Sequence, residues 1–326
     1  VKNFLTSVPL VADLRSPDMR DRHWKSLMDV TGKQFVIDDQ FSLDSLLALE
    51  LHKFEDEVGE IVDCAQKEAK MEVSLAKLEV TWAKVEWAQM KHKDTDVNTI
   101  KLGEEDFEAL EDNQVVVQGM LANRYMKTFE EAITGWNKKL MMVADVNQIL
   151  SEIQRTWAYL ESLFIHSDEV KKELPEAADR FKKIDGVVKQ ILKEACGVKN
   201  VVQSSNKAGL LKDLENQQGQ LEMCEKALAD YMESKRRAFP RFYFVSTADL
   251  LDILSNGNNP VKVMTHMNKC FQAIEKLTLD TEKPAAGKRP KAKGIVSCVG
   301  KETIPFKSEM TLAGKVEEYM NLIIEK

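Results

Sequence analysis

The chain has 326 residues, with 46 lysines and arginines against 53 aspartates and glutamates. This mildly acidic balance argues against a nucleic-acid surface, because proteins that bind nucleic acids usually carry a basic excess. Only 14 glycines and 8 prolines interrupt the sequence, and the runs between them are rich in charge, leucine and alanine, so the composition favours a mostly helical chain.

Membrane insertion and secretion are not indicated either. The sequence has no apolar run of about 18 residues and no signal sequence. It begins at Val1 and not at methionine, so we expect a piece of a longer polypeptide. The five cysteines are scattered and form no CxxC pair. Reduced thiols in a cytosolic compartment are therefore expected, rather than a disulfide framework or a zinc site.

Start and stop signals divide the first two-thirds of the chain into amphipathic helices. Ser16-Pro17-Asp18 is typical of a helix start, with a serine cap and a proline in the first turn. Apolar positions then recur with helical spacing to about Met90, with a break expected near Lys53 or Gly59. Beyond a short strand at 98–101, further helices are expected at about 104–124, 129–164 and from Pro175 onward.

The most regular stretch begins at Leu210. Its seam positions alternate gaps of four and three, which is the spacing of a helix that buries one narrow face against another helix: Leu210, Leu214, Gln217, Leu221, Cys224, Leu228 and Tyr231. The basic turn Lys235-Arg236-Arg237 suits the negative end of the helix dipole, and Pro240 ends the helix because it lacks an N–H donor. We therefore predict one long strut helix.

Two groups of residues flank this strut. The segment 196–209 holds two glycines and a Ser-Ser-Asn run and breaks the helical periodicity, so it is a candidate hinge, formed by Cys196, Gly197, Ser204, Ser205 and Gly209. The other position that stays open is where the strut helix crosses from one bundle to the next. The aromatic corner that follows the strut is expected to be buried and to hold the strut on its base as a structural anchor, formed by Phe239, Pro240, Phe242, Tyr243 and Phe244.

The last third mixes helix with one small hairpin. Ser246 is expected to cap a short helix through Leu254, and 261–279 is expected to form another helix. The basic, proline-containing segment 281–293 predicts a mobile loop. Alternation on either side of Val299-Gly300-Lys301 predicts a β-hairpin before the final helix. The expected subdivision is 1–125, 126–205 ending in the hinge, 206–280 and 281–326.

Catalytic chemistry is not indicated. The sequence contains no GxxxxGK[ST] loop, which would surround nucleotide phosphates with backbone N–H groups, and no GxSxG or HExxH motif. His266 and Cys270 lie one helical turn apart, but a single pair of ligands is a weak metal signal. We therefore predict no catalytic, cofactor-binding or metal-binding residue and no cofactor.

Several long segments resemble the linker of dynein heavy chains, the lever that lies across the motor's AAA+ ring. The most specific is KRRAFPRFYFVSTADLLDILSNG. MRDRHWKSLMDVTG with its RHW triplet, FEALEDNQVVVQGMLANRY and LESLFIHSDEVKKELPEAADRFKKID are also similar, and so is the hairpin followed by KVEEYMNLI, where Tyr319 takes the place of a tryptophan. The resemblance covers about Leu14 to Ile324 except the 281–293 loop. The residues of the similar segments are closer to those of axonemal than of cytoplasmic heavy chains.

The resemblance implies an all-α fold, an elongated array of helical bundles with long amphipathic helices and one small β-hairpin near the C-terminus. It also implies a mechanical linker that bends and straightens as the neighbouring ring hydrolyses ATP. Its partner would be the AAA+ ring of the same heavy chain, with the microtubule reached only through the parent motor, and with no nucleic acid or membrane. The expected location is cytoplasmic and cytoskeletal, in the axoneme of a cilium or flagellum.

Two other functions remain open at this point. A static scaffold or tethering rod of the spectrin type would use the same helices, although the sequence shows no internal repeat of fixed period. A regulatory module that docks partner helices would need a large exposed apolar groove.

Overall fold

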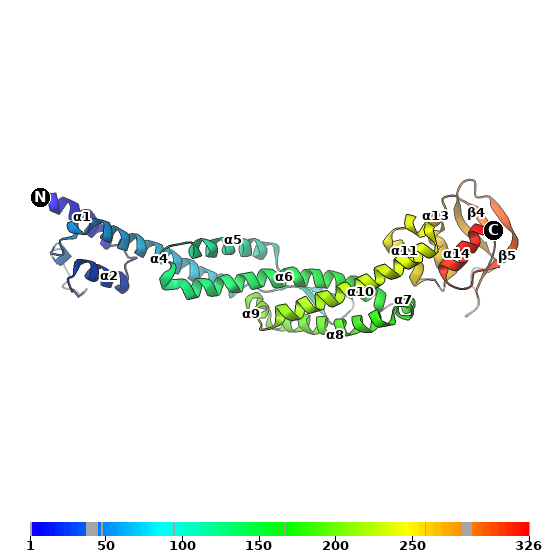
Figure 1. Cartoon of the computed structure of the whole chain (residues 1–326), viewed down its shortest axis with the longest axis horizontal. Coiled ribbons are helices and arrows are strands. Elements are labelled where there is room, and N and C mark those ends of the chain that lie inside the picture. The colour runs from blue at the N-terminus through cyan, green and yellow to red at the C-terminus, as the bar shows by residue number, and fades with distance from the viewer. Residues whose placement is uncertain are drawn as a thin grey trace. The chain divides into compact units, whose positions relative to one another are not determined.

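The computed structural model describes residues 2–36, 45–46, 48–93, 95–165, 167–257, 259–281 and 289–325. They form a mostly helical chain with two small antiparallel sheets (Figure 1). The chain divides into two compact units. Unit 1 consists of 1–90, 100–147 and 195–208, and unit 2 consists of 91–99, 148–194 and 209–326. The four-part subdivision stays a prediction.

Unit 1 is built from helices, and the first of them pack around one apolar cluster. Its elements are α1 (Lys2–Leu14), α2 (Asp21–Thr31), η1 (Leu51–Lys53), α4 (Glu55–Trp82), α5 (Glu104–Leu121), η2 (Met126–Phe129), the first part of α6 (Glu130–Phe164) and α9 (Val201–Ser205). Leu14, Leu27, Leu51 and Val58 are completely or almost completely buried in the cluster, so α1, α2, η1 and the start of α4 share one core.

Two helix boundaries in unit 1 differ from the expectation. The Ser16-Pro17 signal does not start a helix, because Ser16 Oγ instead accepts from the Asp18 N–H at 3.3 Å in a turn and α2 begins at Asp21. The long helix expected to reach Met90 ends at Trp82. The break expected near Lys53 is confirmed, since η1 ends there and α4 starts two residues later.

Unit 2 contains the strut helix and the elements around its C-terminal end. These are α7 (Asp168–Glu173), α8 (Pro175–Val198), α10 (Leu210–Ala238), η3 (Pro240–Phe244), α11 (Thr247–Ser255), α12 (Pro260–Val263), η4 (Met264–His266), α13 (Met267–Cys270) and α14 (Val316–Glu325). Of α8, the residues up to Glu194 belong to unit 2. The strut helix α10 has the predicted extent, and Ser246 caps α11 as predicted, accepting from Asp249 N–H.

Helix α10 contacts α6 and α8, which lie beside it in Figure 1, and its seam residue Cys224 faces α8. Cys224 Sγ lies 3.7 Å from the carbonyl of Ala177 on α8, and Gln218 Nε2 donates to Glu152 of α6 at 2.7 Å. Leu221 and Leu228 on the same seam are buried. The alternating apolar positions therefore make the helix–helix contact that their spacing predicts.

The two sheets correct the all-α expectation. β1 (Ala88–Lys91) pairs with β2 (Asn98–Lys101), and a three-stranded antiparallel sheet has the order β3 (Ile274–Leu279), β4 (Lys291–Ser297) and β5 (Thr303–Thr311). The expected hairpin is therefore two strands of a larger sheet. The helix expected over 261–279 is wrong: short turns end at Cys270, and β3 follows.

The predicted 281–293 loop is partly outside the described residues, which omit 282–288. Its last three residues lie in β4, where Ala292 is opposite Leu279 of β3 and Met310 of β5. A glycine is required at Gly294, because a Cβ there would overlap the backbone carbonyl of Ile304 on β5. This close approach fixes how β4 and β5 meet.

Candidate functional site

The candidate hinge residues occupy three different settings. Cys196 and Gly197 lie within the last turns of α8, whereas Ser204 and Ser205 are buried at the end of α9. Gly209 precedes α10 with a left-handed backbone, φ 84°. The chain leaves helix only after Val198, so the break is later and shorter than the sequence indicates. The bending role stays a prediction.

The turn between α8 and α9 is tied to the segment that follows α4. Asn200 Nδ2 donates to the carbonyl of Trp82 at 2.9 Å, and Asn200 Oδ1 accepts from Gln203 N–H at 2.9 Å, capping α9. The backbone N–H of Val201 donates to the carbonyl of Val85 at 3.1 Å. One asparagine therefore joins two segments more than a hundred residues apart in sequence.

The aromatic corner is only partly buried. Phe239 and Phe242 are fully buried with ring centroids 4.7 Å apart, and Phe271 lies 6.1 Å from Phe239. Tyr243 and Phe244 are exposed, at 54% and 83%, so the expected burial of these two rings is wrong. In the 3₁₀ turn η3, which Pro240 opens, successive side chains point in different directions. The anchoring role stays a prediction for Phe239, Pro240 and Phe242.

A buried carboxylate that the sequence analysis missed organises unit 1. Glu68 of α4 is 4% exposed and accepts from His23 Nε2 at 2.9 Å and from Thr128 Oγ1 at 2.6 Å. Arg22 forms an ion pair with the same carboxylate. Arg22 and His23 are the first two residues of the RHW triplet, so this motif joins α2 to α4 and to η2.

The hydrogen bonds of His23 assign its neutral tautomer. Nδ1 accepts from the backbone N–H of Arg20 at 3.0 Å, so the proton lies on Nε2, which donates to Glu68. A metal ion at Nε2 would displace that proton. Cys64 completes a trio with these two residues, with ligand atoms within 4.8 Å of one another, but burial and the Glu68 charge raise the pKa of its thiol. Zinc needs a thiolate and an imidazole lone pair, so the trio suits hydrogen bonding better than metal binding.

Replacing Glu68 with glutamine should lower the free energy of unfolding by about 1–3 kcal/mol at pH 7, because charge-assisted hydrogen bonds are lost. Burial raises the pKa of Glu68, but hydrogen bonds from Thr128 and Arg22 outweigh it, so the pKa lies below its ordinary value. Such a group stabilises the fold above its unfolded pKa of about 4.3, and the contribution disappears as the pH falls through the folded pKa.

Denaturant unfolding between about pH 3 and 8 tests this dependence. The difference between wild type and Glu68→Gln should shrink on acidification below about pH 4.3. The control is Glu72→Gln on the same helix, which removes a half-exposed pair with Arg20 and should cost less than about 1 kcal/mol. A Glu68 effect that is constant over this range would contradict the pKa argument.

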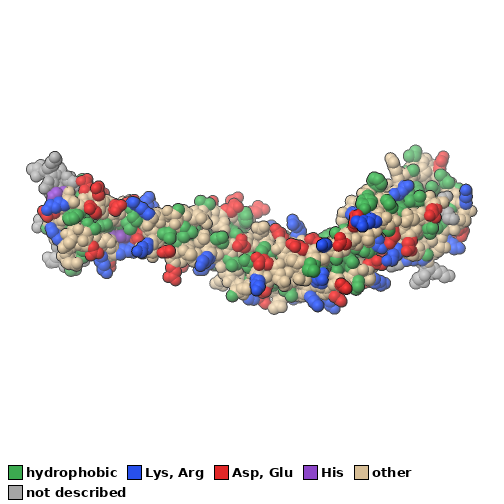
Figure 2. All heavy atoms as spheres, in the orientation of Figure 1, with side chains coloured by type: hydrophobic (Ala, Val, Ile, Leu, Met, Phe, Trp, Pro, Cys, Tyr) green, Lys and Arg blue, Asp and Glu red, His purple; other side chains and the backbone are tan. Residues whose placement is uncertain are grey.

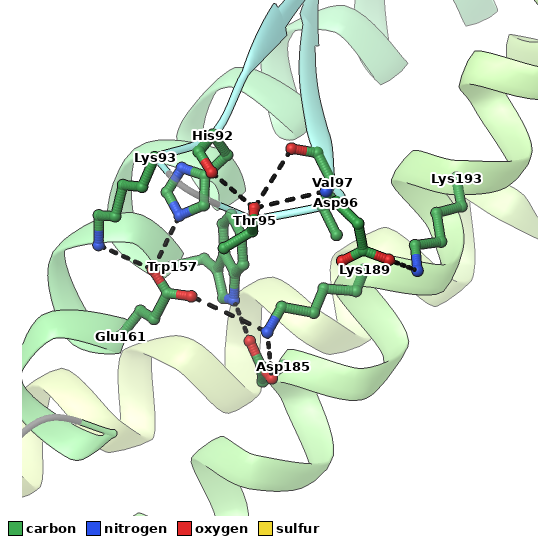
Figure 3. A network of polar contacts seen from close by, with 10 residues as sticks. All are labelled: His92, Lys93, Thr95, Asp96, Val97, Trp157, Glu161, Asp185, Lys189 and Lys193. Atoms are coloured by element: carbon green, nitrogen blue, oxygen red, sulfur yellow. Dashed lines mark hydrogen bonds and ion pairs between the residues drawn. The ribbon is translucent and has the colours of Figure 1, made fainter.

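A second buried carboxylate, Glu161 of α6, holds the turn between β1 and β2 in unit 2 (Figure 3). It accepts from His92 Nε2 and from Lys93 Nζ, each at 2.8 Å, and Lys189 Nζ of α8 lies 3.9 Å away. Burial raises the pKa of Glu161, but the hydrogen bonds from Lys93 and His92 outweigh it and keep the carboxylate charged.

Trp157 extends the same network. Its ring lies 4.5 Å from the His92 ring, and its Nε1 donates to Asp185 of α8 at 2.9 Å. Lys189 also pairs with Asp185, at 2.8 Å. The turn His92–Val97 is closed by Thr95 Oγ1, which donates to the carbonyl of His92 (Figure 3). The network therefore clamps one turn and two helices with charges that neutralise one another.

The positions of these carboxylates were detectable in the sequence. Glu68 falls three residues after Ala65 and three before Met71, on the apolar face of α4. Glu161 follows Trp157 by four residues on α6, where an apolar residue would continue the face. A charge at such a position is expensive unless partners neutralise it, so it indicates a buried polar contact.

The described residues contain charge-balanced clamps between helices, formed around Glu68 and Glu161. On the face drawn in Figure 2, Lys/Arg and Asp/Glu side chains are interspersed. Of the helices that the structure describes, none is sufficiently long and apolar to span a bilayer. The residues that the structure describes therefore form a mostly helical element whose helices are joined by buried ion pairs.

The chain belongs to the dynein heavy chain family, and residues 1–326 match its N-terminal region 2. It is 67% identical over its whole length to the dynein alpha chain, flagellar outer arm, of Chlamydomonas reinhardtii. It is 44% identical, again over its whole length, to the ciliary dynein beta chain of Heliocidaris crassispina, and 42% identical over 99% of its length to human dynein axonemal heavy chain 9. The chain spans 7% of the length of each of these relatives.

Proposed function

We propose that this chain is part of the mechanical linker of an axonemal dynein heavy chain, a lever that bends and straightens across the AAA+ ring as ATP is hydrolysed. Family membership supports the assignment. The structural observation that carries it is the set of long uninterrupted helices α4, α6 and α10, of 28, 35 and 29 residues. The longest corresponds to about 52 Å of continuous helix.

Such helices suit a lever because a packed helix changes length very little under load. Buried polar clamps add directional contacts that resist sliding of one helix along another, whereas apolar packing alone is not directional. Glu68 joins α4 to α2 and η2, and Glu161 joins α6 to the His92 turn. This combination supports transmission of force better than it supports catalysis.

The partner that we propose is the AAA+ ring of the same heavy chain, with microtubules reached only through the rest of the motor. The proposed location is the axoneme, since the relatives are named as flagellar, ciliary or axonemal dyneins. The elongated arrangement and the subdivision of the linker are parts of the same proposal.

Gly197→Ala tests the hinge. Gly197 is helical and a Cβ there meets nothing within 4 Å, so alanine should stabilise the end of α8 by about 0.5–1 kcal/mol. If 196–209 bends, the stiffer helix should reduce the amplitude of the linker swing in the full motor, measured by fluorescence energy transfer between linker and ring. An unchanged amplitude would count against a hinge at this position.

Gly186→Ala is the matched control. Gly186 lies in the same helix, and a Cβ there would likewise meet nothing within 4 Å, but the position is outside the candidate hinge. It should give the same gain in helix stability without changing the swing. Gly209→Ala is a poorer test, because its left-handed backbone makes any Cβ strained. A static scaffold or tether would show no swing in wild type or variants.

A further inference from the structure

Lys235, in the last turn of α10, is a charged residue at a buried seam position. It follows Leu228 by seven residues, the repeat of the seam, and is 6% exposed. Its Nζ donates to Glu317 Oε1 of α14 at 2.6 Å. The side chains of the pair are only 7% and 11% exposed, so an ion pair takes the place of an apolar contact at the base of the strut.

A second carboxylate lies within reach of the same ammonium. Glu173, the last residue of α7, has its Oε2 3.8 Å from Lys235 Nζ. Glu173 also accepts from Lys315 Nζ at 2.9 Å, and this hydrogen bond, together with Lys235, keeps the pKa of Glu173 below its ordinary value. One ammonium therefore faces carboxylates on two different helices.

The space beside the ammonium is not filled by packed side chains. A cavity of about 130 Å³ is lined by Lys235, Glu173 and Glu317 together with Tyr231 and Gly257, and a water needs about 10–15 Å³ of such volume. Lys235 Nζ lies 5.1 Å from the centre of the Tyr231 ring. A shift of about 1 Å toward Glu173 would bring the 3.8 Å separation to a normal charge-assisted distance.

A buried ion pair is a poor choice for stability alone, because well-packed apolar residues of the same volume often stabilise a fold as much or more. Its best-attested use is to fix a register or to act as a switch. The helix dipoles also favour these positions. Lys235 places a positive charge at the C-terminal end of α10, and Glu317 places a negative charge in the first turn of α14.

We propose that Lys235 is a two-position latch, which holds α14 to the end of the strut through Glu317 and releases α14 by transferring its ammonium to Glu173. This proposal rests on the proposed lever function, because a lever needs a joint that opens without leaving a buried charge unpaired. In the released state Glu317 takes water from the cavity in place of Lys235.

Hydrogen–deuterium exchange of the α14 amides in the 326-residue chain tests the latch. Glu317→Gln favours the released state and should raise the exchange rate at least threefold. Glu173→Gln removes the alternative partner and should lower it at least threefold. Because Glu173 also binds Lys315, the second comparison is made in a Lys315→Met background. Lys226→Met, an exposed lysine on α10, is the control and should change nothing.

If Lys235 moves between two partners, the two glutamine variants should change the hydrogen-exchange rate of α14 in opposite directions. A static ion pair would give faster exchange or no change in Glu173→Gln, and either result would overturn the latch. Lys235→Met keeps the measurement informative if Glu317→Gln fails to fold, since it removes both pairings. In this background Glu173→Gln should no longer slow α14 exchange, and slowing that persists would overturn the latch. No motor activity is measured, so failure of the latch leaves the lever proposal standing, whereas the absence of a swing in the wild-type motor would count against the lever alone.

Discussion

Replacing Phe239 with alanine should lower the free energy of unfolding of unit 2 by about 3–5 kcal/mol. The ring is completely buried and packs edge-on against Phe242 at 4.7 Å and near Phe271 at 6.1 Å. Alanine would lose the transfer energy of the ring and leave a cavity, because η3 and α13 on its two sides are fixed by their own backbone hydrogen bonds. The measurement is denaturant unfolding, with the midpoint shifting at constant slope.

Phe244→Ala is the matched control, since it removes the same ring five residues later. Phe244 is 83% exposed, so its loss should change the free energy of unfolding by less than about 0.5 kcal/mol. Equal losses of unfolding free energy in Phe239→Ala and Phe244→Ala would mean that η3 does not bury the first ring and expose the second. If Phe239→Ala is nearly neutral, the corner does not anchor the strut.

The helices were predictable from sequence where their signals are local. The seam of α10, its basic last turn and Pro240 all lie within one stretch, and the helix has the predicted ends. Pro175 and Ser246 likewise place the starts of α8 and α11. Helix propensity, dipole and capping act between neighbours in the chain, so a single sequence contains them.

The strand β3 was not predictable in the same way. Ile274, Leu277 and Leu279 fit a helical continuation of the preceding turns as well as a strand. The decision is made by β4, whose Ile295 lies opposite Leu277 in the antiparallel ladder. This partner is 18 residues away in sequence from Leu277, and its own strand begins inside a basic segment whose composition predicts a loop. Tertiary pairing overrides local preference here.

The buried charges show a different limit. Glu68 and Lys235 each continue a seam, so their positions could indicate burial from sequence alone. Their partners could not be found this way, because His23 and Glu317 lie 45 and 82 residues away from them and each is one of many charged or polar residues. The candidate hinge was located by composition, which finds glycine and serine but not the hydrogen bonds of Asn200.

Trp157→Ala should lower the free energy of unfolding of unit 2 by about 3–5 kcal/mol. Trp157 is completely buried, its ring covers His92, and its Nε1 donates to Asp185. The alanine variant opens a cavity and also lets water reach the Glu161 pair. We therefore expect faster hydrogen exchange in the turn 92–97 as well as lower global stability. Trp136→Ala, on the part of the same helix that belongs to unit 1, is the control. Because Trp136 is only half-buried, its cost should be smaller, and exchange in the turn 92–97 should not change.

A double-mutant cycle with Glu161→Gln separates packing from the polar network. If Trp157 acts only by filling volume, the two losses should add within about 0.3–0.5 kcal/mol. If its ring positions His92 for Glu161, the tryptophan variant already disrupts that hydrogen bond. The second substitution should then cost less, with a coupling of about 0.5–3 kcal/mol. Since the His92–Glu161 distance of 2.8 Å depends on a ring held against Trp157, we expect coupling. If the two free-energy losses are strictly additive, Trp157 and Glu161 make independent contacts on α6. The network would then not resist sliding of the helices as one unit.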